Sequence, residues 1–466
     1  MNDRIPDAES SHCLENFEIA AGRKTGEFYG AVFQDTDVAK WLEAVGFSLA
    51  CYPDEALEKT ADEVIDLIAE AQCEDGYINT YYTIKEPGKR WTDLCEGHEL
   101  YTAGYLIEAA VAYYEGTGKK KFLDCVSKFA DLICDTFGTE EGKIHGYPES
   151  CASIGLALFG LRMAQITGES QYIDVAERAL YNTVLAGIAL DGKSFFYVNP
   201  LEVWPPACME GTSKKHVKPI RQKWFGVACC PPNIARTLAS LGQYIYAENS
   251  KKKELYVNLF VSNETELDWN ENKISVKLQT EFPWVNTYSL EIKNVPEGEM
   301  DLLLRVPDYA QDYQVTADGN MYEENKELEK GYRRVHVEKD TRIEVSFAAP
   351  AKFVYANPQV RADSGKAAIV RGPLVYCLEE IDNSQNLPAV FVDTDTALEE
   401  EKSDLFGGIV TVKARGKKIV ESSVSNSLYS GQKPQLEDVE LTAIPYPYWN
   451  NRGEGEMLVW MKELRP

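Results

Sequence analysis

The sequence predicts a multidomain α+β protein, with a helical half in residues 1–250 and an antiparallel β-sandwich region in residues 251–466. Before residue 250, apolar residues recur with the 3.6-residue period of helices that bury one face. After it, short apolar-polar runs rich in Val, Leu and Tyr are separated by turn residues such as Asp318-Gly319-Asn320. A length of 466 residues and a hydrophobic content of 44% leave room for two or three domains.

Seven segments of the first half fit the helical period. In the first of them, Val38, Leu42 and Val45 fall on one helix face. The predicted helices are 37–51, 57–71, 100–114, 121–137, 153–166, 172–185 and 234–246.

An internal repeat connects four of these helices. Residues 117–124 resemble residues 167–174, and in each copy a glycine, Gly118 or Gly168, follows one helix and precedes the next. Repeated helical hairpins predict a toroid or solenoid of helix pairs. Polar and aromatic connecting loops favour a toroid whose loops line a substrate pocket.

The second half has six predicted strands, at 254–261, 273–278, 287–292, 301–306, 333–337 and 342–347. We expect the segment 369–376 to form one further strand, and the tail from about residue 399 has a looser β pattern. Residues 251–466 therefore have room for two small β domains.

Charge and composition restrict the partners. The net charge of −26 argues against nucleic acid and anionic membranes, because both bind basic surfaces. No apolar run reaches the roughly 20 residues of a membrane span, and no signal peptide is expected. Most of the 11 cysteines are expected to be buried thiols in a reducing compartment. These features predict a cytoplasmic protein with a neutral substrate.

Three cysteines depart from that pattern. Cys229 and Cys230 are adjacent and precede two prolines, and Cys151 lies two residues after Glu149. Adjacent cysteines do not readily form a disulfide, whereas three thiolates and a carboxylate provide the four ligands of tetrahedral zinc. The residue types leave a metal site and two unrelated sets of buried thiols both open. A metal-bound thiolate is also deprotonated, so a structural and a nucleophilic role remain open as well.

Two polar positions are further candidates. His98 opens a predicted helix, where it either binds a sugar hydroxyl or caps the helix. Gln34, beside Asp35, precedes the first predicted helix and is either part of a capping segment or a contact to substrate.

Five motifs occur in order along the chain: Asn2–Glu9, Phe33–Ala44, Gly97–Tyr101, Glu149–Ser153 and Cys229–Asn233. Together they resemble glycoside hydrolase family 127, the β-L-arabinofuranosidases, and the resemblance extends over nearly the whole chain. It implies an (α/α)6 barrel followed by β-sandwich domains. It also implies a retaining hydrolase of small arabinose-containing oligosaccharides or glycosides.

The resemblance implies roles for individual residues. Cys229 is the implied nucleophile: its thiolate attacks the anomeric carbon, a carboxylic acid protonates the leaving oxygen, and water later cleaves the thioglycoside. The implied Zn²⁺ ligands are Glu149, Cys151, Cys229 and Cys230, and the implied sugar-contacting residues are Gln34, His98, Glu177 and Tyr197.

The chain departs from the family pattern in one place. A closed barrel of twelve helices needs roughly 300 residues, and only about 250 precede the β half. Residues 142–148 resemble an early barrel loop, whereas Glu149–Cys151 resembles a much later one, so we expect the helical domain to be shortened near 142–150. In the family, the stretch between these loops carries the acid/base glutamate and two sugar-binding histidines. Glu140 and Glu141 lie nearby but do not match that motif.

Three interpretations follow. The chain is a hydrolase whose acid/base was removed by an internal deletion that left the barrel incomplete. Alternatively, it is a compact active hydrolase that uses another acid, or a non-catalytic zinc-stabilised carbohydrate-binding or scaffold protein. An open barrel would expose apolar helix faces, which predicts association into a homo-oligomer or poor solubility.

Overall fold

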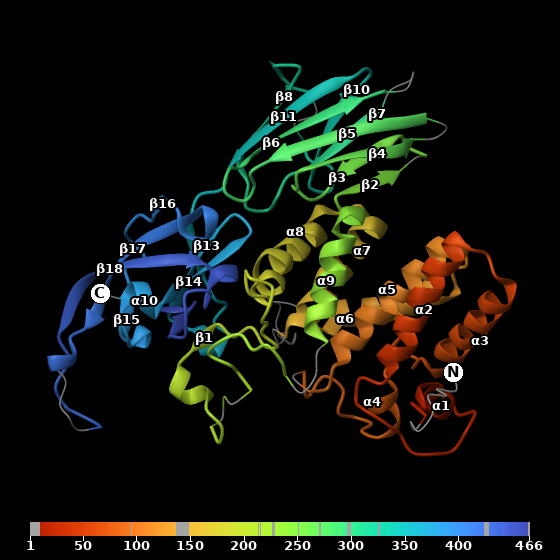
Figure 1. Ribbon diagram of the computed structural model, residues 1–466, viewed down its shortest axis with the longest axis horizontal. Coiled ribbons are helices and arrows are strands. Elements are labelled where there is room, and N and C mark those ends of the chain that lie inside the picture. The colour runs from red at the N-terminus through yellow and green to blue at the C-terminus, as the bar shows by residue number, and fades with distance from the viewer. Residues whose placement is uncertain are drawn as a thin grey trace. The chain divides into compact units, whose positions relative to one another are not determined.

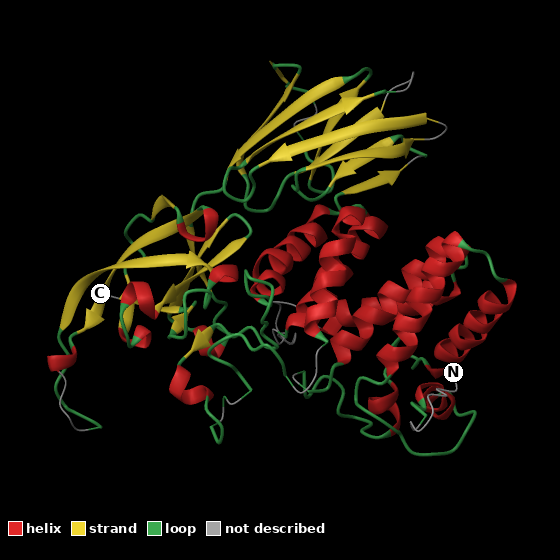
Figure 2. Cartoon of the chain, in the orientation of Figure 1, coloured by secondary structure: helices red, strands yellow, loops and turns green. Residues whose placement is uncertain are grey.

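A computed structural model describes residues 10–94, 96–136, 149–212, 214, 216–225, 229–249, 251–269, 272–295, 300–324, 327–423 and 428–464. Helices and strands are both abundant, as predicted for a multidomain α+β protein (Figure 2). The chain divides into two compact units, Met1–Arg162 and Met163–Pro466.

The first unit is helical. All five helices predicted within it are present, with bounds that differ by a few residues, and two short helices, α1 and α4, are additional. The helices are α1 (Cys13–Ala20), α2 (Asp35–Cys51), α3 (Glu55–Ala71), α4 (Thr80–Ile84), α5 (Glu99–Thr117), α6 (Lys121–Thr136) and α7 (Ser150–Thr167), the last of which continues into the second unit.

Helices α2 and α5 lie side by side (Figure 1) and approach each other closely at two glycines. A Cβ atom on Gly46 would lie 2.5 Å from the carbonyl carbon of Ala112, and one on Gly116 would lie 2.4 Å from the carbonyl oxygen of Gly46. The small residues therefore set the distance between the two helix backbones.

The second unit begins with the end of α7, followed by α8 (Ser170–Ala179) and α9 (Cys230–Ser240). The predicted helix 172–185 is divided, because α8 ends in a π-helical turn at Leu180–Val184. The predicted helix 234–246 starts earlier and ends at Ser240, where a 3-10 turn at Leu241–Tyr244 follows. The repeat is confirmed at its turns: Gly118 and Gly168 have φ of 74° and 69°, in the left-handed region that glycine tolerates.

Two sheets form a sandwich in the middle of the sequence. One contains β2 (Tyr246–Asn249), β3 (Glu254–Val257), β7 (Met300–Arg305) and β10 (Tyr332–Val337). The other contains β4 (Asn263–Trp269), β5 (Asn272–Thr280), β6 (Thr287–Lys293), β8 (Gln311–Ala317), β9 (Asn320–Met321) and β11 (Thr341–Ala348). A single core joins them, with Leu302 and Val335 from the first sheet and Val276 and Val345 from the second.

A ten-stranded sheet occupies the C-terminal part. Its strands are β1 (Glu202–Val203), β12 (Lys352–Tyr355), β13 (Lys366–Arg371), β14 (Leu374–Glu379), β15 (Val390–Val392), β16 (Glu399–Ser403), β17 (Ile409–Ile419), β18 (Leu436–Pro445), β19 (Met457–Leu458) and β20 (Met461–Glu463). The short helix α10 (Glu380–Asn383) follows β14.

Two details of the β prediction are wrong. The segment 369–376 belongs to two strands, β13 and β14, because the chain turns at Gly372, where φ is 53°. The pairing is also not antiparallel throughout, since β3 pairs with β7, and β15 with β20, in parallel. The remaining described strand pairs are antiparallel, as expected.

Helix α7 is largely apolar. Among the described residues it alone has the length and mean hydropathy that a membrane span would need, and 61% of its 18-residue window is buried inside the structure. Core helices of soluble proteins have this composition as well.

Candidate metal centre

The N-terminus of α9 carries both members of the cysteine pair. Cys229 is the N-cap residue and is partly exposed, whereas Cys230 is the first helical residue and is fully buried. Pro231 and Pro232 follow in the first turn, where a proline sacrifices no helical hydrogen bond and its ring fixes φ. The prolines therefore define the helix start from which both thiols project.

The two Sγ atoms lie 3.8 Å apart. A disulfide would require about 2.05 Å. Two thiolates that are each about 2.3 Å from one tetrahedral zinc ion lie about 3.8 Å from each other. The pair therefore has the spacing of two ligands of a single ion.

Glu149 and Cys151 lie at the start of α7. The carboxyl group of Glu149 and the thiol of Cys151 are both buried, and the N–H of Ser153 donates to the backbone oxygen of Glu149 over 2.9 Å. Anionic side chains are favoured in the first turn of a helix, because the backbone N–H groups there carry partial positive charge.

These four residues form a group of potential metal ligands. One ligand atom from each of Glu149, Cys151, Cys229 and Cys230 lies within 4.8 Å of the others. Three soft sulfur ligands and one carboxylate oxygen suit a tetrahedral zinc ion better than a hard cation such as Mg²⁺ or Ca²⁺. The residues predicted to bind metal thus have a donor set and a spacing that fit one ion.

His98 is the N-cap residue of α5 and adopts a left-handed conformation with φ of 52°. Its Nδ1 lies 2.7 Å from the backbone oxygen of Glu96, so Nδ1 carries the proton and donates. The Nε2 atom lies 3.9 Å from a carboxylate oxygen of Glu149, and the rings of Phe33 and Tyr101 lie at 5.1 and 5.7 Å. In the neutral ring, Nε2 is free of a proton and can accept a hydrogen bond from a sugar hydroxyl.

Gln34 is the N-cap residue of α2, but its side chain makes no capping bond. Its Oε1 accepts from the N–H of Ala31 over 3.1 Å, and its Nε2 donates to the backbone oxygen of Ser11 over 3.2 Å. The amide therefore connects two segments that precede α2, and its contact with substrate stays a prediction.

Glu177, on α8, is almost fully buried. Its Oε1 accepts from Arg305, at the end of β7, and its Oε2 accepts from the hydroxyl of Tyr309 over 2.6 Å. Asp174, one turn earlier on α8, accepts from the other terminal nitrogen of Arg305 over 2.6 Å. The predicted sugar-contacting carboxylate thus belongs to a buried charged network.

Tyr197 lies in a loop that contacts residues 222–225. Phe195 forms a β-bridge with Gln222, and the ring of Phe225 lies 4.9 Å from Phe195 and 6.0 Å from Tyr197. The loop that carries Tyr197 therefore packs against residues 222–225, and the contact of Tyr197 with substrate stays a prediction.

Sequence reasoning did not find Arg305 and Tyr309. They lie 128 and 132 residues from Glu177 in the chain, and neither belongs to a motif. An arginine directly after three leucines, in the string Leu302-Leu303-Leu304-Arg305, was the available signal.

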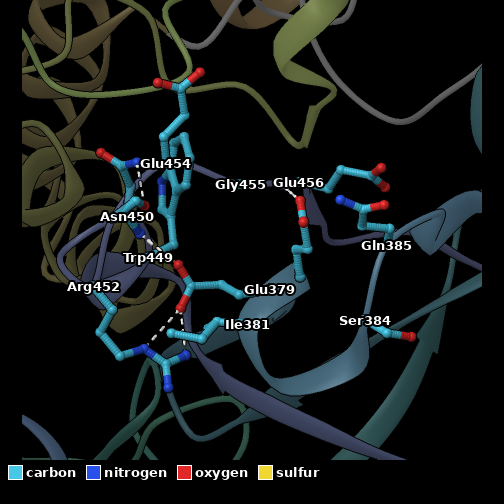
Figure 3. Close-up of a pocket in the computed structure, with 12 residues that line it drawn as sticks. Glu379, Ile381, Ser384, Gln385, Trp449, Asn450, Arg452, Glu454, Gly455 and Glu456 are labelled. Atoms are coloured by element: carbon cyan, nitrogen blue, oxygen red, sulfur yellow. Dashed lines mark hydrogen bonds and ion pairs between the residues drawn. The ribbon is translucent and has the colours of Figure 1, made fainter.

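A separate cavity of about 390 Å³ is lined by the end of β14, by α10 and the residues after it, and by residues between 449 and 456 (Figure 3). Glu379, Trp449 and Arg452 line it, and Arg452 forms an ion pair with Glu379. None of the predicted site residues lines this cavity.

Models of three domain families match the chain. The β-L-arabinofuranosidase GH127 catalytic domain matches residues 1–150 and 144–243, the GH127 middle domain matches 254–350, and the family 127 C-terminal domain matches 351–462. The matches define a carbohydrate-cleaving enzyme built from a catalytic, a middle and a C-terminal domain. The chain belongs to glycoside hydrolase family 127.

Individual relatives agree over almost the full chain. A non-reducing end β-L-arabinofuranosidase of Bifidobacterium longum subsp. longum is 28% identical, with 97% of this chain and 92% of the relative covered. The crystal structure of a GH127 β-L-arabinofuranosidase from Geobacillus stearothermophilus T6 is 38% identical, covers 99% of this chain and 95% of its own, and has a TM-score of 0.67. A second GH127 β-arabinofuranosidase structure is 28% identical, covers 97% and 92%, and has a TM-score of 0.61.

Proposed function

We propose that the chain is a retaining hydrolase of the β-L-arabinofuranosidase type, with Glu149, Cys151, Cys229 and Cys230 bound to one Zn²⁺ ion. The proposal rests on the four-residue group, whose ligand atoms lie within 4.8 Å of one another. The names of the relatives support the sugar specificity. When bound, zinc would keep the cysteine side chains deprotonated at neutral pH.

Cys229 is the nucleophile of this proposal. It is partly exposed, whereas Cys230 is fully buried, so Cys229 is the member of the pair that a substrate can reach. Its sulfur forms a bond to the anomeric carbon as the bond to the leaving oxygen breaks, and the leaving group departs with the electron pair. Water then attacks the same carbon and returns the thiolate. His98, Gln34, Glu177 and Tyr197 would hold the sugar.

We propose that this chain lacks the acid that protonates the leaving group. The match to the catalytic domain is divided into two segments that meet at 144–150. The alignment with the Bifidobacterium relative extends over 613 positions, more than the 466 residues of the chain, so it contains positions at which this chain has no residue. Both observations support an internal deletion near 142–150. Residues 137–148, with Glu140 and Glu141, lie outside the described residues.

The same deletion supports our proposal for the domains. We infer an incomplete (α/α)6-type barrel in residues 1–250 and two β domains in 251–466, in line with the middle and C-terminal matches. Homo-oligomerisation and a cytoplasmic location stay predictions. The ten described cysteines are free thiols.

A second function has specific support. Without the acid/base segment, the chain could bind arabinose-containing glycans without cleaving them, as a zinc-stabilised carbohydrate-binding or scaffold protein. The experiment that separates the two functions combines a titration with L-arabinose and an assay with an aryl β-L-arabinofuranoside. Turnover that is lost in Cys229→Ser supports the hydrolase, and binding without turnover supports the second function. Neither binding nor turnover in the zinc-loaded protein would contradict both.

A further inference from the structure

We propose that Arg305 and Tyr309, from the middle β-sandwich, are positioning residues that orient the carboxylate of Glu177 toward the sugar. This inference rests on the proposed function, in which Glu177 contacts the sugar. It adds a role for the middle domain, whose residues would complete a site that is otherwise carried by helices and their loops.

Both carboxylate oxygens of Glu177 accept hydrogen bonds. Arg305 donates to Oε1 and the Tyr309 hydroxyl donates to Oε2 over 2.6 Å. Donors at both oxygens fix the plane of a carboxylate, and each oxygen retains a second lone pair for another donor. A sugar hydroxyl could occupy one of these remaining positions.

Arg305 itself has a fixed orientation. It is fully buried, and its three guanidinium nitrogens have different acceptors: the backbone oxygen of Asn258 at 2.7 Å, Asp174 at 2.6 Å, and Glu177. The ring of Phe260 lies 4.8 Å from its central carbon. The end of β3 and the end of β7 thus locate the group that holds Glu177.

The charges in this network do not balance. Two buried carboxylates, Asp174 and Glu177, share one guanidinium. Burial raises the pKa of Asp174 to about 6, although the charge of Arg305 opposes the shift. Burial and the charge of Glu177 raise the pKa of Tyr309 well above its ordinary value, so its hydroxyl stays protonated and remains a donor. A surplus negative charge is costly in a purely structural network, and a donating sugar hydroxyl would reduce that cost.

A matched pair of tyrosines tests the inference. Tyr309→Phe removes only the donor to Glu177. Tyr332→Phe removes another buried hydroxyl of the same unit, which donates to the side-chain oxygen of Asn258 over 2.8 Å. The two variants lose the same chemical group, so their losses in melting temperature should be similar.

The measurement is the Kd for L-arabinose of the zinc-loaded full chain, by calorimetric titration at a temperature where all proteins are folded. We expect Tyr309→Phe to weaken binding about threefold to tenfold, because a misaligned carboxylate loses part of a charged hydrogen bond. Tyr332→Phe should stay within about twofold of the wild-type value.

Other outcomes overturn different claims. If wild-type protein binds L-arabinose and both variants bind it equally, Tyr309 has no positioning role, and the proposed function stands. If wild-type protein neither binds L-arabinose nor cleaves the aryl β-L-arabinofuranoside, the proposed function fails and this inference fails with it.

Discussion

At the residue scale, the adjacent cysteines differ in what they can do. Both thiols leave the start of α9 with their sulfur atoms 3.8 Å apart, but only Cys229 is partly exposed. A fully buried thiol can still bind a metal ion, whereas a nucleophilic thiol must also be accessible to the substrate. The difference in exposure therefore supports our proposal that Cys230 only binds metal, whereas Cys229 both binds metal and acts as the nucleophile.

Removal of one thiolate should reduce metal binding. We expect Cys230→Ser to lower the zinc content from about one ion per chain to well below one, because a serine hydroxyl is a poor substitute for a soft thiolate. Cys51→Ser is the control, since Cys51 is exposed and lies outside the ligand group. Elemental analysis of both variants after dialysis checks this, and equal zinc contents would refute the ligand assignment.

The buried carboxyl group of Glu99 should make the stability of the protein depend on pH. Burial raises its pKa to about 7, although the Tyr77 hydroxyl and the N–H of Trp91 donate to it. Between the unfolded value of 4.5 and about 7, the folded chain holds a proton that the unfolded chain releases. Stability should therefore fall as the pH rises through this window and level off above it.

Glu99→Gln should flatten that dependence. Between pH 5 and pH 8 we expect the wild-type free energy of unfolding to fall by on the order of 1–3 kcal/mol more than that of the variant. Urea denaturation at both pH values measures it, with Glu63→Gln, at an exposed position on α3, as the control. Identical pH profiles for Glu99→Gln and wild type would show that Glu99 does not titrate in this range.

At the scale of elements, the close approach of α2 and α5 gives a packing prediction. Gly46→Ala places a methyl group 2.5 Å from the Ala112 backbone, so the helices must separate, which should cost about 1–3 kcal/mol of stability. Gly242→Ala is the matched control, because a Cβ there meets no atom within 4 Å and φ is not positive. Thermal unfolding compares them. A Gly46→Ala variant as stable as Gly242→Ala would mean that α2 and α5 do not pack as described.

The elements also show what the sequence could predict. Helices such as α3 and α6 have one apolar and one polar face, so their period predicts them within a few residues. The short helices α1 and α4 have too few turns to show a period. Gly372 divides a continuous apolar run into β13 and β14, and an apolar run alone does not reveal a turn.

The residues of the candidate site also differ in whether the sequence alone could predict them. Glu149, Cys151, Cys229 and Cys230 are unusual in type and spacing, so the sequence alone could indicate them. The resemblance to the family supplied their roles. Arg305 and Tyr309 could not be predicted, because their hydrogen bonds to Glu177 join segments that are far apart in the sequence.

At the scale of the whole molecule, the proposed loss of the acid/base segment predicts that the rate depends on the leaving group. A nitrophenolate leaves without a proton, whereas a sugar alkoxide needs general acid assistance, which typically contributes about 100-fold or more in rate. We expect zinc-loaded protein to cleave a nitrophenyl β-L-arabinofuranoside and to leave an arabinose disaccharide almost intact. Kinetics on both substrates measure this ratio. Comparable rates would show that the chain contains an acid, as the compact active hydrolase requires.

The central claim is that the thiolate of Cys229 attacks the anomeric carbon. If the missing segment would also supply the base that activates water, the pentosyl-cysteine should accumulate with an activated substrate. The direct measurement is mass spectrometry of peptides from zinc-loaded protein incubated with a nitrophenyl β-L-arabinofuranoside. The account predicts one pentosyl group on Cys229, absent from Cys229→Ser. A pentosyl group on Cys230 or on a carboxylate, or turnover that persists in Cys229→Ser, would contradict it.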